Sequence, residues 1–196
     1  MNLTDSLYDE LKEYARLNRI PIIRDESLEL LLDEVKKKKP RSILEIGTAI
    51  GYSGTKMLEA SPEAKLYTIE IDPVSADIAR ETFKRAGVYD RVVLWEGDCV
   101  EIVAYLEGKY DFIFLDGPKA HYLEMLPYLT ECMNSGGVLF SDNVFFYGYV
   151  EQDTVYNKKK TIIRNMRKYL EALKNDDRLV TELIKNGDGV AISVKR

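Results

Sequence analysis

The chain has 196 residues, 45% of them hydrophobic and 31% charged, so it is able to bury a core and does not have the composition of a disordered protein. Its 33 acidic residues outnumber its 28 basic ones, and the formal net charge of −5 excludes a protein that coats nucleic acid with an entirely basic surface. Two cysteines, Cys99 and Cys132, do not form a disulfide framework, and neither a signal-peptide pattern nor an apolar run of about 18 residues occurs. We therefore expect one cytoplasmic domain over residues 1–196, with no membrane partner.

The first 40 residues carry the pattern of two helices that cover the rest of the domain. Apolar residues recur there at three- and four-residue steps, which is the spacing of one helix face. These positions are Leu3, Leu7, Leu11, Tyr14 and Leu17 in the first helix and Leu28, Leu31, Leu32 and Val35 in the second. Pro21 separates the two helices, because the residue before a proline disfavours the helical conformation. Lys36–Lys39 and Pro40 end the second, since basic side chains suit a helix C-terminus.

From Arg41 onward, short apolar runs alternate with helical segments. The runs predict strands at 43–46, 66–71, 92–95, 112–115 and 137–140, with helices near 53–60, 74–86, 99–107, 120–133 and 159–174. This alternation is typical of βαβ units, which form a parallel sheet covered by helices on both faces. Two further strands at 179–184 and 190–194, joined by the turn Asn186–Gly189, predict a closing hairpin and an antiparallel edge. The predicted fold is a doubly wound α/β domain.

The segments after the first two strands indicate a nucleoside site, because ligands of such sheets bind at the carboxyl ends of the strands. Glu45, Gly47, Gly51 and Ser53 follow the first strand with GxxxG spacing, which differs from the GxGxxG of dinucleotide enzymes and by itself is also typical of a tight turn. Glu70 ends the second strand, where a carboxylate can accept hydrogen bonds from a ribose diol or simply be solvated. Together the two features favour a nucleoside ligand.

Asp98 and Cys99 follow the third strand. Asp98 is placed to cap the next helix and also to accept from an adenine amino group, and the two roles are compatible. Cys99 has no basic or histidine neighbour that would favour a thiolate, so we expect it to pack rather than to act as a nucleophile.

The fourth and fifth strands end in oxygen donors, namely Asp116 after one and Asp142 with Asn143 after the other. Two carboxylates and an amide at neighbouring strand ends suit Mg²⁺, or Ca²⁺ or Mn²⁺, although a lone aspartate at a strand end is usually a cap. Lys119 follows Asp116 by three residues, as a base, as an electrostatic guide or as one half of a solvated ion pair. His121, the only histidine, is expected at the surface or on a lid.

A basic segment stands out against the acidic composition, since residues 154–170 contain six basic side chains and no acidic one. These are Lys158, Lys159, Lys160, Arg164, Arg167 and Lys168. On a helix the last four share one face, which would suit the phosphates of an RNA, with Tyr147 or Tyr149 available to stack on a base. The alternative is a solvated helix face.

Taken together, these residues resemble the class I S-adenosylmethionine methyltransferases, in the metal-dependent O-methyltransferase group that includes catechol and caffeoyl-CoA enzymes. The resemblance extends from about Ile20 to Arg196, and within the group it is strongest to the bacterial tRNA 5-hydroxyuridine O-methyltransferase family. The motifs that carry it are Ile43–Ser53, Ser141–Val144 followed by Gly148–Val150, and Gly187–Ser193 with its basic tail.

The resemblance implies a Rossmann-like, seven-stranded, mostly parallel sheet with an antiparallel C-terminal hairpin, and a helical cover over residues 1–40. It implies that S-adenosylmethionine is bound by Ile23, Glu45, Gly47, Gly51, Ser53, Glu70, Asp98, Cys99 and Asp116. It further implies a divalent metal, such as Mg²⁺, on Asp116, Asp142 and Asn143, and catalytic roles for Lys119 and Asp116.

The expected reaction is O-methylation of 5-hydroxyuridine at the wobble position of tRNA, which yields 5-methoxyuridine. The expected partners are the tRNA anticodon arm, on the basic segment, and a second copy of the chain in a homodimer. One alternative is an O-methyltransferase of a catechol-like small molecule. A second alternative, from another class, is a nucleoside-binding module without catalysis.

Overall fold

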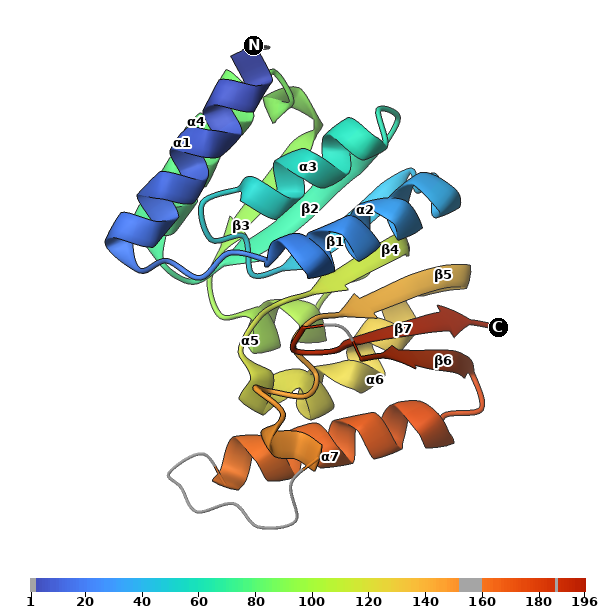
Figure 1. Cartoon of the computed structure of the whole chain (residues 1–196). Coiled ribbons are helices and arrows are strands. Elements are labelled where there is room, and N and C mark those ends of the chain that lie inside the picture. The colour runs from blue at the N-terminus through green and yellow to red at the C-terminus, as the bar shows by residue number, and fades with distance from the viewer. Residues whose placement is uncertain (1–2, 152–159, 186) are drawn as a thin grey trace.

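A single mixed sheet organises the chain in the computed structural model, which describes residues 3–151, 160–185 and 187–196 (Figure 1). Its strands are β1 Ser42–Ile46, β2 Lys65–Glu70, β3 Val92–Glu96, β4 Tyr110–Leu115, β5 Met133–Ser141, β6 Leu179–Ile184 and β7 Val190–Lys195. In the described part of the chain their order is β3-β2-β1-β4-β5-β7-β6. The first five strands are parallel, and β7 runs antiparallel to both β5 and β6. The predicted mostly parallel sheet with an antiparallel C-terminal hairpin is confirmed.

Helices cover both faces of this sheet (Figure 1). They are α1 Leu3–Asn18, α2 Asp25–Lys38, α3 Tyr52–Ala60, α4 Pro73–Arg85, α5 Cys99–Ala104, α6 Tyr122–Cys132 and α7 Lys160–Asn175. Short 3₁₀ turns lie at η1 Tyr89–Arg91, η2 Lys119–His121 and η3 Tyr149–Glu151. Helices α1 to α4 share one buried cluster, and α5 to α7 share the other. None of the helices in these described ranges has the length and apolarity that crossing a membrane requires.

The central strands are buried on both faces, as parallel strands between two helical layers must be. On β4, Phe112 and Phe114 pack toward α2 and α3, whereas Ile113 and Leu115 pack toward α6, and all four are fully buried. This alternation explains why β4 appears in the sequence as a continuous apolar run rather than as an alternating one.

The N-terminal cover differs from the predicted one in the face that α1 buries. Leu7 and Leu11 are buried as expected, and Ala15 joins them, whereas Tyr14 and Leu17 are 42% and 65% exposed. The buried stripe therefore follows four-residue steps, because α1 lies along α4 at the margin of the domain and contacts its neighbours through a narrow surface (Figure 1). An ion pair of 2.6 Å between Glu10 and Arg85 joins these two helices.

At the opposite edge from the strands' carboxyl ends, Asp111 joins three strands. Its carboxylate accepts hydrogen bonds from the backbone N–H groups of Arg41 (2.9 Å) and Ser42 (3.2 Å) and from the Asn134 amide (2.8 Å). Burial alone would raise the pKa of Asp111, but the hydrogen bonds from Asn134, Arg41 and Ser42 together hold it below its ordinary value of 3.8. The carboxylate form is thus stabilised by folding.

Asp111→Asn is expected to lower the free energy of unfolding by about 1–3 kcal/mol. The asparagine amide has one acceptor oxygen, and its NH₂ group cannot accept a hydrogen bond in place of the second carboxylate oxygen. Since the folded pKa is the lower one, the contribution of Asp111 is fully present above pH 3.8 and is lost as the pH falls through the folded pKa. Denaturant unfolding measures this difference. The matched control is Asp77→Asn, whose side chain is 80% exposed, and equal stability of the two variants would contradict the prediction.

Candidate functional site

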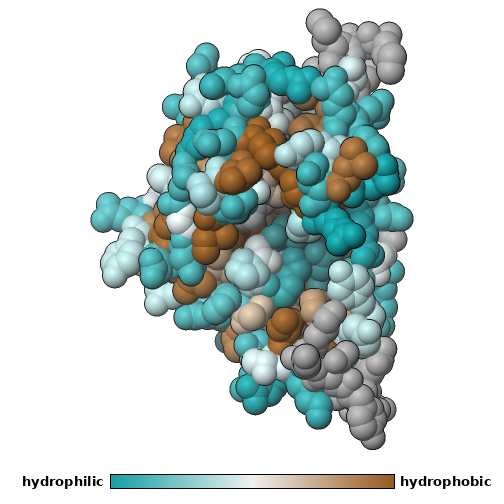
Figure 2. Space-filling model, turned by 90° about the vertical axis from the view of Figure 1, so that its left-hand side faces the viewer, coloured by the Kyte–Doolittle hydropathy of each residue, from teal (hydrophilic) through white to brown (hydrophobic). Residues whose placement is uncertain are grey.

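A cavity of about 660 Å³ opens at the edge of the sheet where the parallel strands end. Figure 2 looks onto this edge and shows a hollow flanked by apolar side chains. The segment Ile20–Arg24, between α1 and α2, forms one wall of the cavity, and the segments that follow β1 to β5 form the others. Its volume lies within the range of small-molecule and cofactor sites.

The turn after β1 can approach the turn after β4 only because Gly47 carries no side chain. A Cβ atom built on Gly47 would lie 2.7 Å from the carbonyl oxygen of Asp116, and its φ of +99° also favours glycine. Gly51, which the resemblance places at the cofactor, does not line the cavity. It precedes α3 and packs against Ala79.

Glu45 is also set back from the predicted position, because it lies behind the cavity wall and is fully buried. Its carboxylate accepts hydrogen bonds from the hydroxyls of Ser53 (2.6 Å) and Thr68 (2.7 Å). Burial raises the pKa of Glu45 to about 7, although these two donors oppose the rise. Ser53 itself lines the cavity, so Glu45 orients a lining hydroxyl and does not line the cavity itself.

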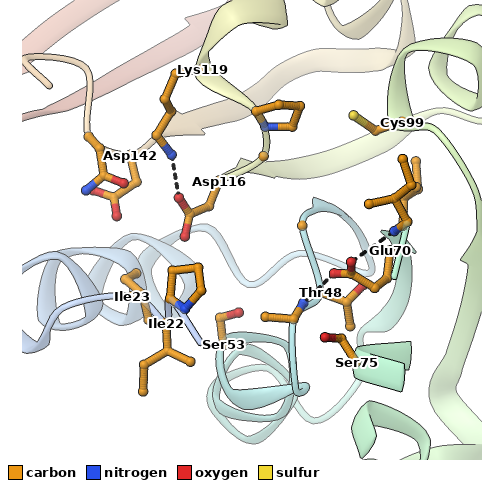
Figure 3. A pocket seen from close by; sticks show the side chains of 18 of the residues that line it. Ile22, Ile23, Thr48, Ser53, Glu70, Ser75, Cys99, Asp116, Lys119 and Asp142 are labelled. Atoms are coloured by element: carbon orange, nitrogen blue, oxygen red, sulfur yellow. Dashed lines mark hydrogen bonds and ion pairs between the residues drawn. The ribbon is translucent and has the colours of Figure 1, made fainter. Parts of the chain in front are cut away.

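Glu70 ends β2 and lies across the cavity from Lys119 and Asp116 (Figure 3). Its carboxylate accepts from the N–H groups of Ala49 (2.8 Å), Ile71 (3.0 Å) and Asp72 (2.9 Å). Three backbone donors fix its orientation at the end of the strand, in the position predicted from the sequence.

Asp98 and Cys99 complete this end of the cavity. Asp98 caps α5 by accepting from the N–H of Val100 (2.8 Å), as predicted, and it also lines the cavity. Burial raises the pKa of the Cys99 thiol to about 11, so the thiol stays protonated at neutral pH and is not an activated nucleophile. Ile23 is buried and lines the same cavity.

The other end of the cavity is charged. The ammonium of Lys119 lies 2.7 Å from Oδ1 of Asp116, with both side chains largely buried. Asp142 is 1% exposed, and its Oδ1 accepts a hydrogen bond of 2.8 Å from the hydroxyl of Ser27. Its Oδ2 has no hydrogen-bond partner among the described residues. Burial, followed by the negative charge of Asp116, raises the pKa of Asp142 to about 6.

The predicted metal ligands meet at this charged end, where Asp116, Asp142 and Asn143 line the cavity together. In residues 3–151, 160–185 and 187–196, no group of three or more His, Cys, Asp and Glu side chains could hold a metal, so this donor set depends on the amide of Asn143. A buried acceptor without a donor, such as Oδ2 of Asp142, would be satisfied by a cation. The oxygen donors therefore fit a hard divalent ion.

The hairpin turn between β6 and β7 supports the loop after Asn143, which the sequence did not indicate. The backbone oxygen of Asp188 accepts from the N–H of Phe145 (2.8 Å), and its Oδ1 accepts from the N–H of Tyr147 (3.1 Å). Its Oδ2 pairs with Arg24 (3.1 Å). Asn143 has a φ of +55°, so this support holds a backbone that side chains rarely adopt.

Three of the site residues just described, Ser27, Arg24 and Asp188, were not identified from the sequence as functional. Asp188 stands in the segment Gly187–Ser193, which predicts a hairpin turn and contributes to the family resemblance but does not reveal that the carboxylate of Asp188 is buried. Ser27 and Arg24 belong to no motif. Their contacts lie 115 and 164 positions away in the chain, so no local pattern would have found them.

The basic segment is only partly described. Lys158 and Lys159 lie outside the described residues, whereas Lys160, Arg164 and Lys168 are exposed on α7. Arg167 is also exposed, and it donates from Nε to the carbonyl of Val150 (2.9 Å). Asn165 on the same helix donates to the carbonyl of Ala120 in η2 (3.0 Å) and so ties α7 to the cavity rim. His121 in η2 is half exposed, contacts Glu124 and lines the cavity.

Comparisons with known proteins agree in one family. The family model described as O-methyltransferase matches residues 5–196. Tapetum-specific methyltransferase 1 of Arabidopsis thaliana is 29% identical over an alignment 194 positions long, which covers 93% of this chain and 81% of that protein. A catechol O-methyltransferase of Sus scrofa is 38% identical over 122 residues, covering 58% and 66% of the two chains. The solved O-methyltransferase from Bacillus cereus in complex with SAH has a TM-score of 0.87 at 25% identity, over 97% of this chain and 91% of that one.

Glu45→Gln is expected to change the pH dependence of stability. Because folding raises the pKa of Glu45 from 4.5 to about 7, its ionisation opposes folding, and wild-type stability falls as the pH rises through this window. Glutamine does not ionise, so the free energy of unfolding of the variant relative to wild type should rise by on the order of 3 kcal/mol between pH 4.5 and pH 7. Urea unfolding at several pH values measures this difference. Glu59→Gln, at an exposed position on α3, should show a flat difference, and an equally flat one for Glu45→Gln would contradict the prediction.

Proposed function

This chain belongs to the O-methyltransferase family, and from that membership we propose that it transfers the methyl group of S-adenosylmethionine to 5-hydroxyuridine at the wobble position of tRNA. The observation that carries the transfer is that a nucleoside-type end and an acidic, oxygen-rich end share one cavity. The observation that favours tRNA is the basic face of α7 beside that cavity. By the family resemblance alone, we further propose a homodimer that acts in the cytoplasm.

The donor molecule is assigned to the end of the cavity that contains Glu70. The Glu70 carboxylate, fixed by three backbone N–H groups, would hold the ribose hydroxyls. Asp98 and the backbone of Cys99 would border the adenine, while Ser53 and Ile23 would contact the methionine portion. The B. cereus relative in complex with SAH supports a donor of this chemistry.

The acceptor is assigned to the charged end, where Asp116, Asp142 and Asn143 would hold a divalent cation such as Mg²⁺. When bound, such an ion lowers the pKa of a coordinated hydroxyl and orients an acceptor that offers a second oxygen. Catechols offer two vicinal oxygens, and 5-hydroxyuridine similarly offers its 5-hydroxyl beside the 4-carbonyl.

Lys119 stands between the two ends, and we assign it the electrostatic part of the reaction. Its ammonium, held 2.7 Å from Asp116 and only 14% exposed, stabilises negative charge on the acceptor oxygen. The acceptor hydroxyl first loses its proton to solvent; a lone pair of the resulting anionic oxygen then forms the new bond to the methyl carbon as the carbon–sulfur bond breaks, and the sulfur keeps that electron pair to give S-adenosylhomocysteine. Holding donor and acceptor in one cavity removes much of the entropic barrier.

The basic face of α7 carries the choice of tRNA as acceptor. Lys160, Arg164 and Lys168 are exposed along it, on a protein whose net charge is −5. The helix adjoins the cavity rim at Ala120, so phosphates along it would lead toward the acceptor end. Tyr147, which lines the cavity and is 58% exposed, presents a ring on which a base could stack.

A catechol-like small molecule is the second candidate acceptor, favoured by the similarity to the catechol O-methyltransferase of Sus scrofa. S-adenosylmethionine would still bind at the end of the cavity that contains Glu70, and the same oxygen ligands would hold the cation. The basic face of α7 would then have no role. A nucleoside-binding module without catalysis accounts less well for the site, because binding alone does not need Lys119 paired with Asp116 at the same end of the cavity as the buried carboxylate of Asp142.

Methyl transfer from labelled S-adenosylmethionine separates these candidates. We expect label in tRNA that carries 5-hydroxyuridine, none in the unmodified transcript, and loss of transfer when a chelator replaces Mg²⁺. Transfer to a catechol but not to the hydroxylated tRNA would retain the methyltransferase and reject the tRNA. Transfer that is unchanged by the chelator would reject the metal.

Replacing three of the exposed basic residues of α7 by glutamine (Lys160→Gln, Arg164→Gln, Lys168→Gln) should weaken tRNA binding at least about tenfold and reduce the slope of log K against log salt by about 2 to 3. The control variant removes the same charge elsewhere, through Arg16→Gln, Lys37→Gln and Lys84→Gln, whose side chains are exposed. Filter binding across a salt series measures both effects. Equal losses in the two variants would show a non-specific charge effect and reject α7 as the tRNA face.

A further inference from the structure

A buried hydroxyl on the first turn of α2 holds the side chain of Asp142. Ser27 is 3% exposed, and its Oγ donates to Oδ1 of Asp142 over 2.8 Å. Ser27 does not use its hydroxyl to cap its own helix, because the start of α2 has no side-chain cap hydrogen bond. The hydroxyl of Ser27 instead contacts Asp142, directly after β5, which lines the cavity.

The backbone of Asp142 is fixed by other groups. Its N–H donates to the carbonyl of Leu115 (3.1 Å), and its own carbonyl accepts from the hydroxyl of Tyr122 (3.3 Å). These bonds set the position of the Cα atom but leave the carboxyl group free to turn. Among the described residues, the Ser27 hydroxyl is the side-chain donor that fixes that rotation, and it occupies one oxygen while Oδ2 has no partner.

We propose that Ser27 is a positioning residue for the divalent cation, a role that rests on the proposed function of Asp142 as a ligand. By holding Oδ1, the Ser27 hydroxyl presents Oδ2 of Asp142 to the cation and keeps the carboxylate from turning away. Such outer contacts orient the ligands of metal sites, and their loss typically lowers metal affinity about 10–100-fold. Ser27 itself is not a ligand in this proposal.

The start of α2 is well suited to this role because it is fastened to the same region a second time. Arg24, which directly precedes the helix, pairs with Oδ2 of Asp188 over 3.1 Å. Asp188 in turn accepts from the N–H of Tyr147, in the loop that follows Asp142 and Asn143. Two contacts three residues apart thus hold the first turn of α2 against the ligand loop, which makes the Ser27 hydroxyl a rigid donor.

Titration calorimetry with Mn²⁺ tests the proposal. Ser27→Ala should bind Mn²⁺ about 10–100-fold more weakly than wild type, while its affinity for S-adenosylhomocysteine stays within about twofold. Ser27→Thr keeps the hydroxyl and should recover most of the loss. At saturating Mn²⁺ the methyl-transfer kcat of Ser27→Ala should approach that of wild type, with a raised apparent KM for the ion.

The matched control is Ser61→Ala, since Ser61 is also a buried serine whose hydroxyl donates to one acceptor, the carbonyl of Pro40 (2.9 Å), away from the cavity. It should leave Mn²⁺ affinity unchanged. Wild-type affinity in Ser27→Ala would overturn the inference, as would an equal loss in Ser61→Ala or in Ser27→Thr. If the unaltered protein binds no Mn²⁺, the metal in the proposed function fails first, and the role of Ser27 fails with it.

Discussion

The site depends on one close contact between two turns. Gly47, after β1, packs against the backbone of Asp116, after β4, with no room for a side chain between them. The N–H of Asp116 also donates to the carbonyl of Ile46, so the two turns leave the sheet as a bonded pair. In the strand order, β1 lies between β2 and β4, and ligands of open α/β sheets bind where the order reverses in this way. The contact sets the spacing between the end of the cavity that contains Glu70 and the charged end.

Two buried carboxylates near this contact, those of Glu45 and Asp142, differ in how many of their oxygens have a hydrogen-bond donor. Glu45 has a hydroxyl donor for each of its oxygens, from Ser53 and Thr68, so both oxygens have hydrogen-bond partners within the protein, although burial still raises its pKa. Asp142 has a side-chain donor, Ser27, on Oδ1, and its Oδ2 has no partner among the described residues. A buried, incompletely satisfied carboxylate is costly to fold, and such costs are retained where a ligand offsets them. Both carboxylates are desolvated, but Glu45 supports a lining residue, whereas Asp142 keeps one oxygen available to a ligand.

The antiparallel hairpin contributes more than an edge to the sheet. Its turn contacts the loop after β5 through Asp188 and through Gly189, whose carbonyl accepts from the N–H of Val144 (3.0 Å). A Cβ atom on Gly189 would lie 1.9 Å from the ring of Phe145, so only glycine allows the turn to seat there. Since Asn143 and Tyr147 have positive φ values, this support maintains a strained loop at the charged end of the cavity.

The sheet, its antiparallel edge and the residues that end each strand were predictable from the order of residues alone. They were predictable because strand and helix periodicities are local, and because the carboxyl ends of parallel strands meet at one edge; Glu70, Asp116 and Asp142 therefore had to come together. That Glu45 lies behind the cavity wall and that Leu17 of α1 is exposed became evident only from the packed structure. These outcomes depend on how helices pack on the sheet, which the order of residues within an element does not specify.

The contacts of Ser27 and Arg24 were likewise decided by the tertiary structure. Their partners, Asp142 and Asp188, lie more than a hundred residues further along the chain. A serine or an arginine at the start of a helix has the same local pattern whether it faces solvent or a buried carboxylate. What distinguishes the two cases is the desolvation of the carboxylate, and that arises only when the helix and the loop are packed together.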